Sequence, residues 1–180
     1  QVTVSEETKE EAARKYTDTL VEKALQAERE FATFTQEQVD KIVNAAALAG
    51  SEAALALAHE AVDETGRGVV EDKDTKNRFA TENVYHSIKD DKTVGVIGED
   101  KVLGSVKIAS PLGVLAGIVP TTNPTSTAMF KSLISLKTRN AIVFAFHPQA
   151  QNCSVHAAKI IYNAAVEAGA PKDIIQWIEK

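Results

Sequence analysis

The sequence predicts an α/β protein in which N-terminal helices and a β-hairpin precede the start of a doubly wound, Rossmann-like parallel sheet. Apolar residues recur at helical spacing through the first half, and two short β-branched runs follow it. After residue 110, fully apolar runs alternate with helical patterns, which indicates parallel strands joined by right-handed crossovers. We therefore expect a helical segment at 1–91, a hairpin at 92–110 and the first βαβαβ unit of a nucleotide-binding domain at 111–180.

Helical signals dominate the first segment, where apolar residues follow the period of amphipathic helices. The stretch Thr35-Gln-Glu-Gln38 has the form of a capping box, which predicts a helix start. Gly66 is suited to the left-handed conformation that follows a helix C-terminus. The expected helices span residues 7–34, 36–49, 51–64 and 72–88.

Strand signals begin after residue 92. Short β-branched runs on either side of the turn-like Gly98-Glu-Asp-Lys101 predict a hairpin. Two later runs, VLAGIV and AIVFAF, are apolar on both faces, as central parallel strands are. The expected strands span residues 93–97, 105–108, 114–119, 141–146 and 174–178, with helices at 126–139 and 154–168.

Composition narrows the class of function. The formal net charge is −5 and no block of Lys and Arg is present, so nucleic acid is not an expected partner. The longest apolar stretch, near 112–119, is too short to span a bilayer, and the start is polar, so no membrane association is expected. The single Cys excludes an internal disulfide and fits a cytoplasmic location. Gln1 is not a natural start, so we expect residues upstream of it.

Two polar loops follow the apolar strands, Pro120-Thr-Thr-Asn-Pro124 and His147-Pro-Gln149. In a doubly wound sheet, ligands bind outside the carboxyl ends of the strands. The Gly-x-Gly-x-x-Gly fingerprint is absent, so any dinucleotide must be held differently. An Asn amide aimed at a developing oxyanion is a catalytic electrophile. The alternative is structural, since Thr, Asn and Pro are common in turns and Thr125 or Ser126 is a suitable cap for the next helix.

The motif IVPTTNPTSTAMFKSLISLKTRNAI resembles the aldehyde dehydrogenase superfamily, in particular its CoA-acylating branch and the N-terminal half of bifunctional aldehyde-alcohol dehydrogenases. The segments FTQEQVDKIVNAAALA, GVVEDKDTKN and EAGAPKDIIQWI are similar to that family as well. The resemblance covers nearly the whole chain after about residue 15. It implies the aldehyde dehydrogenase fold, with 111–180 opening the NAD-binding domain and the domain incomplete within these residues.

The resemblance also implies roles for the two loops. Asn123 corresponds to the asparagine that stabilises the oxyanion. His147 stands where non-acylating relatives have a lysine that binds the adenosine ribose, although a half-exposed strand-end histidine explains it equally well. Gln149 departs from the arginine that is frequent there, which leaves a phosphate contact unsupported. The residues implied in NAD binding are Ile118, Val119, Pro120, Thr121, Thr122, Asn123 and His147.

Cys153 lies at the start of a predicted helix, where the helix dipole can lower a thiol pKa. By resemblance the nucleophilic cysteine of the family lies downstream of this chain, so we expect Cys153 to be incidental and the chain alone to be inactive. His59, His86 and His156 show no ligand spacing, so no metal site is expected. Iron would belong only to a fused alcohol dehydrogenase domain.

The function that the resemblance implies is the NAD-dependent interconversion of acetyl-CoA and acetaldehyde, with CoA as a substrate. The parent protein would make ethanol if it is bifunctional. By resemblance the hairpin is a candidate subunit contact in a homo-oligomer. The alternative is a non-catalytic nucleotide-binding or assembly module. A cysteine-containing continuation after Lys180 would favour the enzyme.

Overall fold

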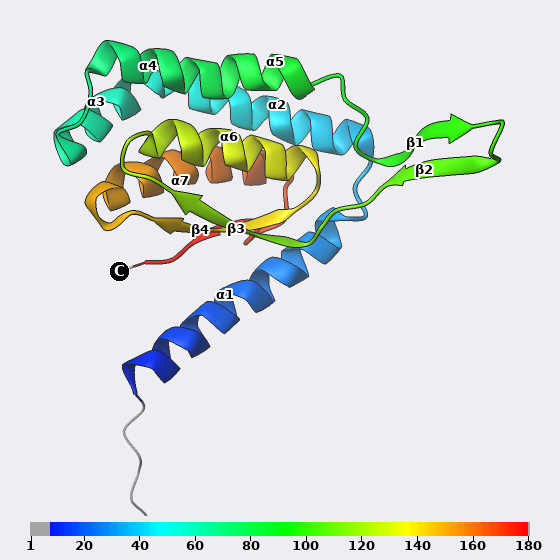
Figure 1. Ribbon diagram of the computed structural model, residues 1–180, viewed down its shortest axis with the longest axis horizontal. Helices are drawn as coiled ribbons and strands as arrows, with labels where there is room; N and C mark the ends of the chain where they lie inside the picture. Colours follow the sequence, from blue (N-terminus) through cyan, green and yellow to red (C-terminus); the bar gives the residue numbers. More distant parts are fainter. Residues whose placement is uncertain (1–7, 180) are drawn as a thin grey trace, which may run out of the picture.

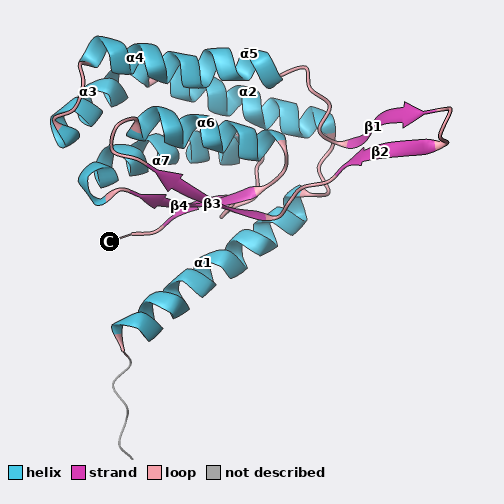
Figure 2. Ribbon diagram, in the orientation of Figure 1, coloured by secondary structure: helices cyan, strands magenta, loops and turns pink. Residues whose placement is uncertain are grey.

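The computed structural model describes residues 8–179 and consists of a small parallel sheet between helical layers, with a separate hairpin (Figures 1 and 2). Glu7, the predicted start of the first helix, lies outside the described residues. The helices are α1 (Lys9–Phe31), α2 (Gln36–Glu52), α3 (Ala54–Thr65), α4 (Val70–Arg78), α5 (Val84–Ile88), α6 (Pro124–Lys137) and α7 (Gln151–Glu167). A π-helical turn at Phe79–Asn83 joins α4 to α5, and a 3₁₀ turn at Pro148–Ala150 precedes α7. The strands are β1 (Gly95–Asp100), β2 (Ser105–Ala109), β3 (Val114–Val119), β4 (Ala141–Phe146) and β5 (Ile175–Trp177).

The parallel sheet has the order β3-β4-β5, as expected for consecutive right-handed crossovers. One face is covered by α6 and α7, with α2 packed on both of them and α4 and α5 outermost (Figure 1). The opposite face is crossed by α1. One hydrophobic core joins these layers: Phe31 of α1, Ile42 of α2, Leu133 of α6 and Phe144 of β4 are all fully or almost fully buried in it.

The helix signals in the N-terminal half are confirmed, with small shifts at the ends. Thr35 accepts a hydrogen bond from the Gln38 amide, and the Gln38 side chain accepts one from the Thr35 amide, which completes the predicted capping box. Gly66 has φ 64° and ends α3 as predicted. Only the C-terminal half of α1 packs on the sheet, through residues such as Phe31, whereas residues 9–19 are exposed.

Strand β3 departs from the expectation that both faces are buried. Val119 is buried at 2% exposure, whereas Ile118 is 65% exposed and Ala116 is exposed as well. The reason is that β3 is an edge strand within the described sheet and α1 covers the opposite face only in part. Gly117 is needed on the buried face, because a Cβ there would lie 2.5 Å from the Phe144 ring.

The helix predicted at 72–88 is interrupted by the π-helical turn at Phe79–Asn83. The Thr81 hydroxyl donates to the Asn77 carbonyl at 2.9 Å and to the Arg78 carbonyl at 3.3 Å, so it competes with the regular backbone ladder. Thr81 is fully buried against Gly50, where an added Cβ would lie 2.7 Å from the Thr81 methyl group. The turn follows from these side-chain contacts and not from helix propensity.

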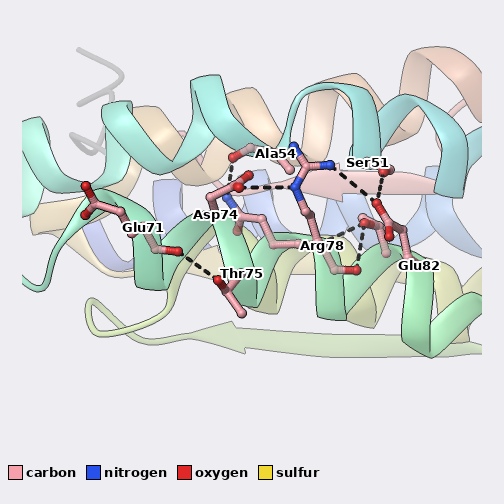
Figure 3. A network of polar contacts seen from close by, with 9 residues as sticks. Ser51, Ala54, Glu71, Asp74, Thr75, Arg78 and Glu82 are labelled. Atoms are coloured by element: carbon pink, nitrogen blue, oxygen red, sulfur yellow. Dashed lines mark hydrogen bonds and ion pairs between the residues drawn. The ribbon is translucent and has the colours of Figure 1, made fainter.

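The outward side of α4 carries a polar network, which Figure 3 shows. Arg78 pairs with Asp74 at 3.1 Å and with Glu82 at 3.5 Å, and Glu82 accepts a hydrogen bond from Ser51 of α2. Arg78 and Glu82 are about half exposed and Asp74 is partly exposed, so solvent weakens the contribution of these ion pairs to stability. The network ties the α4 layer to α2.

The hairpin β1–β2 projects from the body of the protein (Figure 1). Its base is tethered by the Gln36 side-chain oxygen, which accepts from the Thr93 and Val94 amides, and by Arg139, which donates to the Ala109 carbonyl. The hairpin predicted at 93–108 is therefore confirmed. Strand β1 begins two residues later and ends three residues later than predicted, whereas β2 begins at the predicted residue and ends one residue later.

No single helix within residues 8–179 combines the length and the apolar character needed to cross a bilayer. The helices α2 and α3 reach both only when they are taken together, and they are bent by 59° relative to each other. Several of their apolar residues, among them Ile42 and Leu57, are buried in the protein.

Candidate active site at the strand ends

The carboxyl ends of β3 and β4 lie side by side. The strands are paired in parallel with Val119 opposite Phe146, so the loops that begin at Pro120 and His147 leave the same edge of the sheet. This is the edge at which open α/β sheets bind ligands. The two polar loops selected from the sequence are therefore neighbours in the fold.

Asn123 is the N-cap of α6 but does not cap it. An N-cap asparagine usually accepts a hydrogen bond from an amide of its own first turn, whereas Asn123 makes no such bond. Helix α6 begins at Pro124, two residues earlier than predicted, because proline is favoured at the first helical position. Thr125 and Ser126 consequently lie inside the first turn and are not at the N-cap position. The Asn123 amide is left available for other partners.

Helix α4 holds the loop that carries Asn123. The Lys73 ammonium donates to the Thr122 carbonyl at 3.0 Å, and the Lys76 ammonium donates to Asn123 Oδ1 at 3.0 Å. Asn77 accepts from the Thr125 hydroxyl at 2.8 Å. We call Lys73, Lys76 and Asn77 the α4 bracket. Their spacing of three and four residues places them on one face of the helix.

The α4 bracket is itself anchored. Asn77 is 1% exposed, and its amide nitrogen donates to the Ala54 carbonyl at 2.8 Å, so both ends of this side chain are satisfied. Lys73 is buried as well, and its desolvation, followed by repulsion from Lys76, lowers the pKa of its ammonium group. Thus Lys73 holds the backbone of Thr122 before Asn123, Asn77 holds the side chain of Thr125 after it, and Lys76 contacts the Asn123 side chain.

A cavity of about 570 Å³ opens beside Asn123. Its surface is mainly apolar, and Lys76 and Asn123 are among the polar residues that line it. Phe79 reaches it from the π-helical turn, and Phe130 reaches it from α6. The lining residues are Thr75, Lys76, Phe79, Ala80, Val84, Asn123, Ser126, Thr127 and Phe130. An amide at the wall of an apolar cavity can bind a carbonyl oxygen whose remaining substituents are apolar.

The other predicted cofactor residues differ in accessibility. Ile118, Pro120 and Thr122 are exposed, and Thr121 is partly exposed, so their side chains can face a ligand. Val119 is buried in the core, so only its backbone can do so.

His147 is exposed at the end of β4. Its Nδ1 atom accepts a hydrogen bond from the Gln149 amide at 3.2 Å and caps the 3₁₀ turn. Nδ1 is therefore the acceptor nitrogen of the ring, and Nε2 is left to face solvent or a ligand. Gln149 is exposed beside it. Asn123 and His147 thus occupy neighbouring strand ends, with different surroundings.

Cys153 lies in the first turn of α7, but it is 1% exposed. Burial, and then the nearby Glu64 carboxylate, raises the pKa of its thiol from 9.0 to about 12. The helix dipole does not lower this pKa, because the thiol is buried and Glu64 already accepts from the amides of Asn152 and Cys153 at 2.9 and 2.7 Å. A protonated, buried thiol is a poor nucleophile.

The α4 bracket is the part of the site that the sequence reasoning missed. Its only local signal is the spacing of Lys73, Lys76 and Asn77 within KDTKN, which is equally typical of a solvated helix face.

Within residues 8–179, no group of three or more His, Cys, Asp or Glu side chains is arranged to hold a metal ion.

Comparisons with known proteins agree with this architecture. The sequence matches the aldehyde dehydrogenase family over residues 4–180. It is 59% identical over 161 residues to the bifunctional aldehyde-alcohol dehydrogenase AdhE of Escherichia coli, an alignment that covers 89% of this chain and 18% of that protein. Its structure is similar to that of an acetylating aldehyde dehydrogenase from Geobacillus thermoglucosidasius, with a TM-score of 0.89 and 50% identity, covering 91% of this chain and 36% of that one.

A more distant structural relative is the propionaldehyde dehydrogenase of Rhodopseudomonas palustris, solved with bound CoA and an acylated cysteine. The TM-score is 0.76 at 29% identity, and the match covers 91% of this chain and 37% of that one. The chain therefore spans well under half the length of each of these relatives.

Proposed function

Because the chain belongs to the aldehyde dehydrogenase family, we propose that it forms the N-terminal part of an NAD-dependent, CoA-acylating aldehyde dehydrogenase. The proposed reaction is acetyl-CoA + NADH + H⁺ ⇌ acetaldehyde + CoA + NAD⁺. Two relatives support it by name, one as an acetylating aldehyde dehydrogenase and one as a bifunctional aldehyde-alcohol dehydrogenase. The observation that carries the proposal is the N-cap asparagine whose amide does not cap its own helix and lies instead at an apolar cavity.

The strand ends fit a dinucleotide. The exposed apolar side chain of Ile118 offers a surface for a flat ring, and the polar loops beside it offer hydrogen-bonding groups. The outward Nε2 of His147 can reach a ribose hydroxyl. The bound dinucleotide supplies the hydride that reduces the acyl group. The role of this chain is to hold it at the edge of the sheet, beside Asn123.

In this proposal Asn123 stabilises the reacting oxygen. An acyl group attached to a cysteine thiol develops negative charge on its oxygen when a nucleophile or a hydride adds to the carbonyl carbon. The Nδ2 group of Asn123 donates a hydrogen bond to that oxygen, which lowers the barrier more than it strengthens ground-state binding. The nucleophile is a cysteine outside these residues, since Cys153 is buried and protonated. The acylated cysteine of the R. palustris relative supports this type of intermediate.

The cavity beside Asn123 is proposed to hold the substituent on the acyl carbon. Its walls include Phe79, Phe130 and Val84, so a methyl or other short alkyl group is favoured over a polar one. Acetaldehyde and acetyl-CoA fit this description. A bifunctional parent protein would carry a second, alcohol-forming domain, and any iron would belong to that domain.

We also propose that the hairpin contacts a second subunit. It projects from the body, and it exposes large apolar side chains at Val102 (95%), Leu103 (78%) and Ile108 (65%). Exposed apolar clusters mark interaction surfaces. The double change Leu103→Asp with Ile108→Glu is expected to lower the molecular mass of the full-length protein measured by light scattering. An unchanged mass would remove the hairpin from the subunit contact.

The test of the proposed function uses the full-length protein. We expect NADH oxidation, followed at 340 nm, that depends on acetyl-CoA and releases free CoA in equal amount. Mass spectrometry after rapid quenching should find an acetyl group on a cysteine other than Cys153. Binding of NADH without acetyl-CoA-dependent turnover would instead support a non-catalytic nucleotide-binding module.

A further inference from the structure

We propose that Lys76 is a positioning residue that orients the Asn123 amide so that its NH₂ group points toward the reacting oxygen. The inference rests on the proposed function, since it assumes that Asn123 is the oxyanion donor. Its structural basis is the bond from the Lys76 ammonium to Asn123 Oδ1 at 3.0 Å, at the edge of the cavity that both residues line.

The direction of this bond decides the orientation of the amide. An asparagine side chain has an acceptor end and a donor end, and rotation about χ2 by half a turn exchanges them. A lysine ammonium has three donors and no acceptor, so it pairs only with the oxygen. Once Oδ1 is held by Lys76, the donor end of Asn123 must face the opposite direction. The remaining bond of Nδ2, to the Thr122 hydroxyl, is long at 3.5 Å and leaves this group available.

The charge of Lys76 adds a second effect. A hydrogen bond from a cation polarises the amide carbonyl, and polarisation along a chain of hydrogen bonds makes the N–H groups at the other end stronger donors. The Asn123 amide therefore transmits part of the positive charge of Lys76 toward the oxygen that becomes negative. Lys76 acts through Asn123 and needs no contact with substrate.

The three residues of the α4 bracket have separable roles. Lys73 and Asn77 are buried and hold the Thr122 carbonyl and the Thr125 hydroxyl, so their loss disturbs the fold of the loop. Lys76 is exposed, and its hydrogen bond to this loop is made to the side chain of Asn123 and not to the backbone. Changing Lys76 is therefore expected to leave the backbone, and hence the folded structure, intact.

The test is a double-mutant cycle in the full-length enzyme, with Lys76→Met, Asn123→Ala and the double variant. We expect Lys76→Met to lower kcat about tenfold while KM for NADH stays within about twofold. In the Asn123→Ala background the same change should cost almost nothing, because the group through which Lys76 acts is gone. Lys76→Arg should restore kcat to within about threefold, since Arg keeps the cationic donor.

The controls separate a positioning role from a general effect. Lys41→Met removes an exposed cation from α2 and should match the parent enzyme in kcat. The melting temperature of each Lys76 variant should also match, and Lys76→Ala replaces the Met variant if that one is destabilised. An unchanged kcat in Lys76→Met, or equal losses with and without Asn123, would overturn the role of Lys76 while leaving the proposed function intact. An unchanged kcat in Asn123→Ala would overturn both.

Discussion

The loops after β3 and β4 leave the same edge of the sheet, yet they are held in opposite ways. The β3 loop is held by another element, because the α4 bracket bonds to Thr122, Asn123 and Thr125. The β4 loop contains its own stabilising bond, since the His147 ring accepts a hydrogen bond from the Gln149 amide. Behind it, the first amides of α7 are already bonded to the Glu64 carboxylate.

This difference suggests a division of labour. A group that stabilises a transition state has to be placed to within a few tenths of an ångström, so it requires a rigid supporting shell. A group that binds one hydroxyl of a large cofactor tolerates more freedom. The bracketed β3 loop suits the first task, and the exposed His147 suits the second. The predictions below test this division, from the largest expected effect to the smallest.

The first prediction concerns the one thiol near these loops. With its pKa raised from 9.0 to about 12, Cys153 should carry about a thousandfold less thiolate at pH 8 than an ordinary thiol. In the native full-length protein we therefore expect almost no alkylation by iodoacetamide on the peptide that contains Cys153, and full labelling after unfolding in guanidinium. Rapid labelling of Cys153 in the native protein would place a reactive thiol beside the β4 loop and contradict the proposed difference between the two loops.

The same pKa shift predicts a dependence of stability on pH. Because the folded state holds the thiol proton more tightly than the unfolded state, the contribution of Cys153 to stability is complete below pH 9 and falls as the pH rises toward 12. Cys153→Ser should reduce this loss, as measured by thermal unfolding across that range. The variant should also keep its acetyl-CoA-dependent rate within a few-fold of the parent enzyme. A several-hundredfold loss of rate would make Cys153 part of the chemistry.

The second prediction concerns the rigidity of the β3 loop. Asn77→Leu replaces a buried polar side chain with an apolar one of similar size, which leaves the Thr125 hydroxyl and the Ala54 carbonyl without their partner. We expect a loss of about 2–4 kcal/mol in the stability of this region. Faster hydrogen exchange in the peptide covering residues 119–128 is the measurement.

The matched control for this change is Arg78→Leu, on the outward side of the same helix (Figure 3). The side chains of Arg78 and Glu82 are each 46% exposed and that of Asp74 is 23% exposed, so solvent weakens these ion pairs and exchange in residues 119–128 should stay near that of the parent protein. Equal effects of the two variants would show that α4 supports the loop only as a whole helix and not through Asn77.

The third prediction concerns the β4 loop and has the smallest effect. His147→Ala should weaken NADH binding by about threefold, measured by fluorescence titration, because one exposed hydrogen bond to the cofactor is lost. The rate at saturating NADH should not change. Gln149→Ala, two residues away, should have no effect on either quantity. A fall in kcat with unchanged NADH affinity in His147→Ala would reverse the roles of the two loops.

Local signals in the sequence were sufficient for most of the architecture. The capping box at Thr35, the left-handed Gly66 and the apolar runs of β3 and β4 each act within a few residues, so the pattern and the structure agree on these elements, although β3 is buried on one face only. The proximity of Asn123 and His147 follows from one further rule, that consecutive parallel strands in a right-handed crossover end at the same edge.

The features that the sequence did not reveal depend on contacts between distant residues. Lys76 meets Asn123 across 47 positions, and Cys153 meets Glu64 across 89. Helical spacing alone cannot distinguish Lys76 from any other exposed cation. The dipole at the start of α7 favours a low thiol pKa, but burial of the thiol, together with the Glu64 carboxylate brought in by α3, raises the pKa instead. The π-helical turn has no local signal in the sequence either, and it lies where Thr81 packs against the distant Gly50.

The central claim is that Asn123 stabilises the transition state and does not merely bind the cofactor. Its most direct test is Asn123→Ala in the full-length enzyme, with kcat for acetyl-CoA reduction and the dissociation constant for NADH measured on the same preparation. Loss of one oxyanion donor costs about 3 kcal/mol, so kcat should fall roughly a hundredfold while the NADH dissociation constant stays within about twofold. An unchanged kcat with clearly weaker NADH binding would contradict the claim and make Asn123 a cofactor-binding residue.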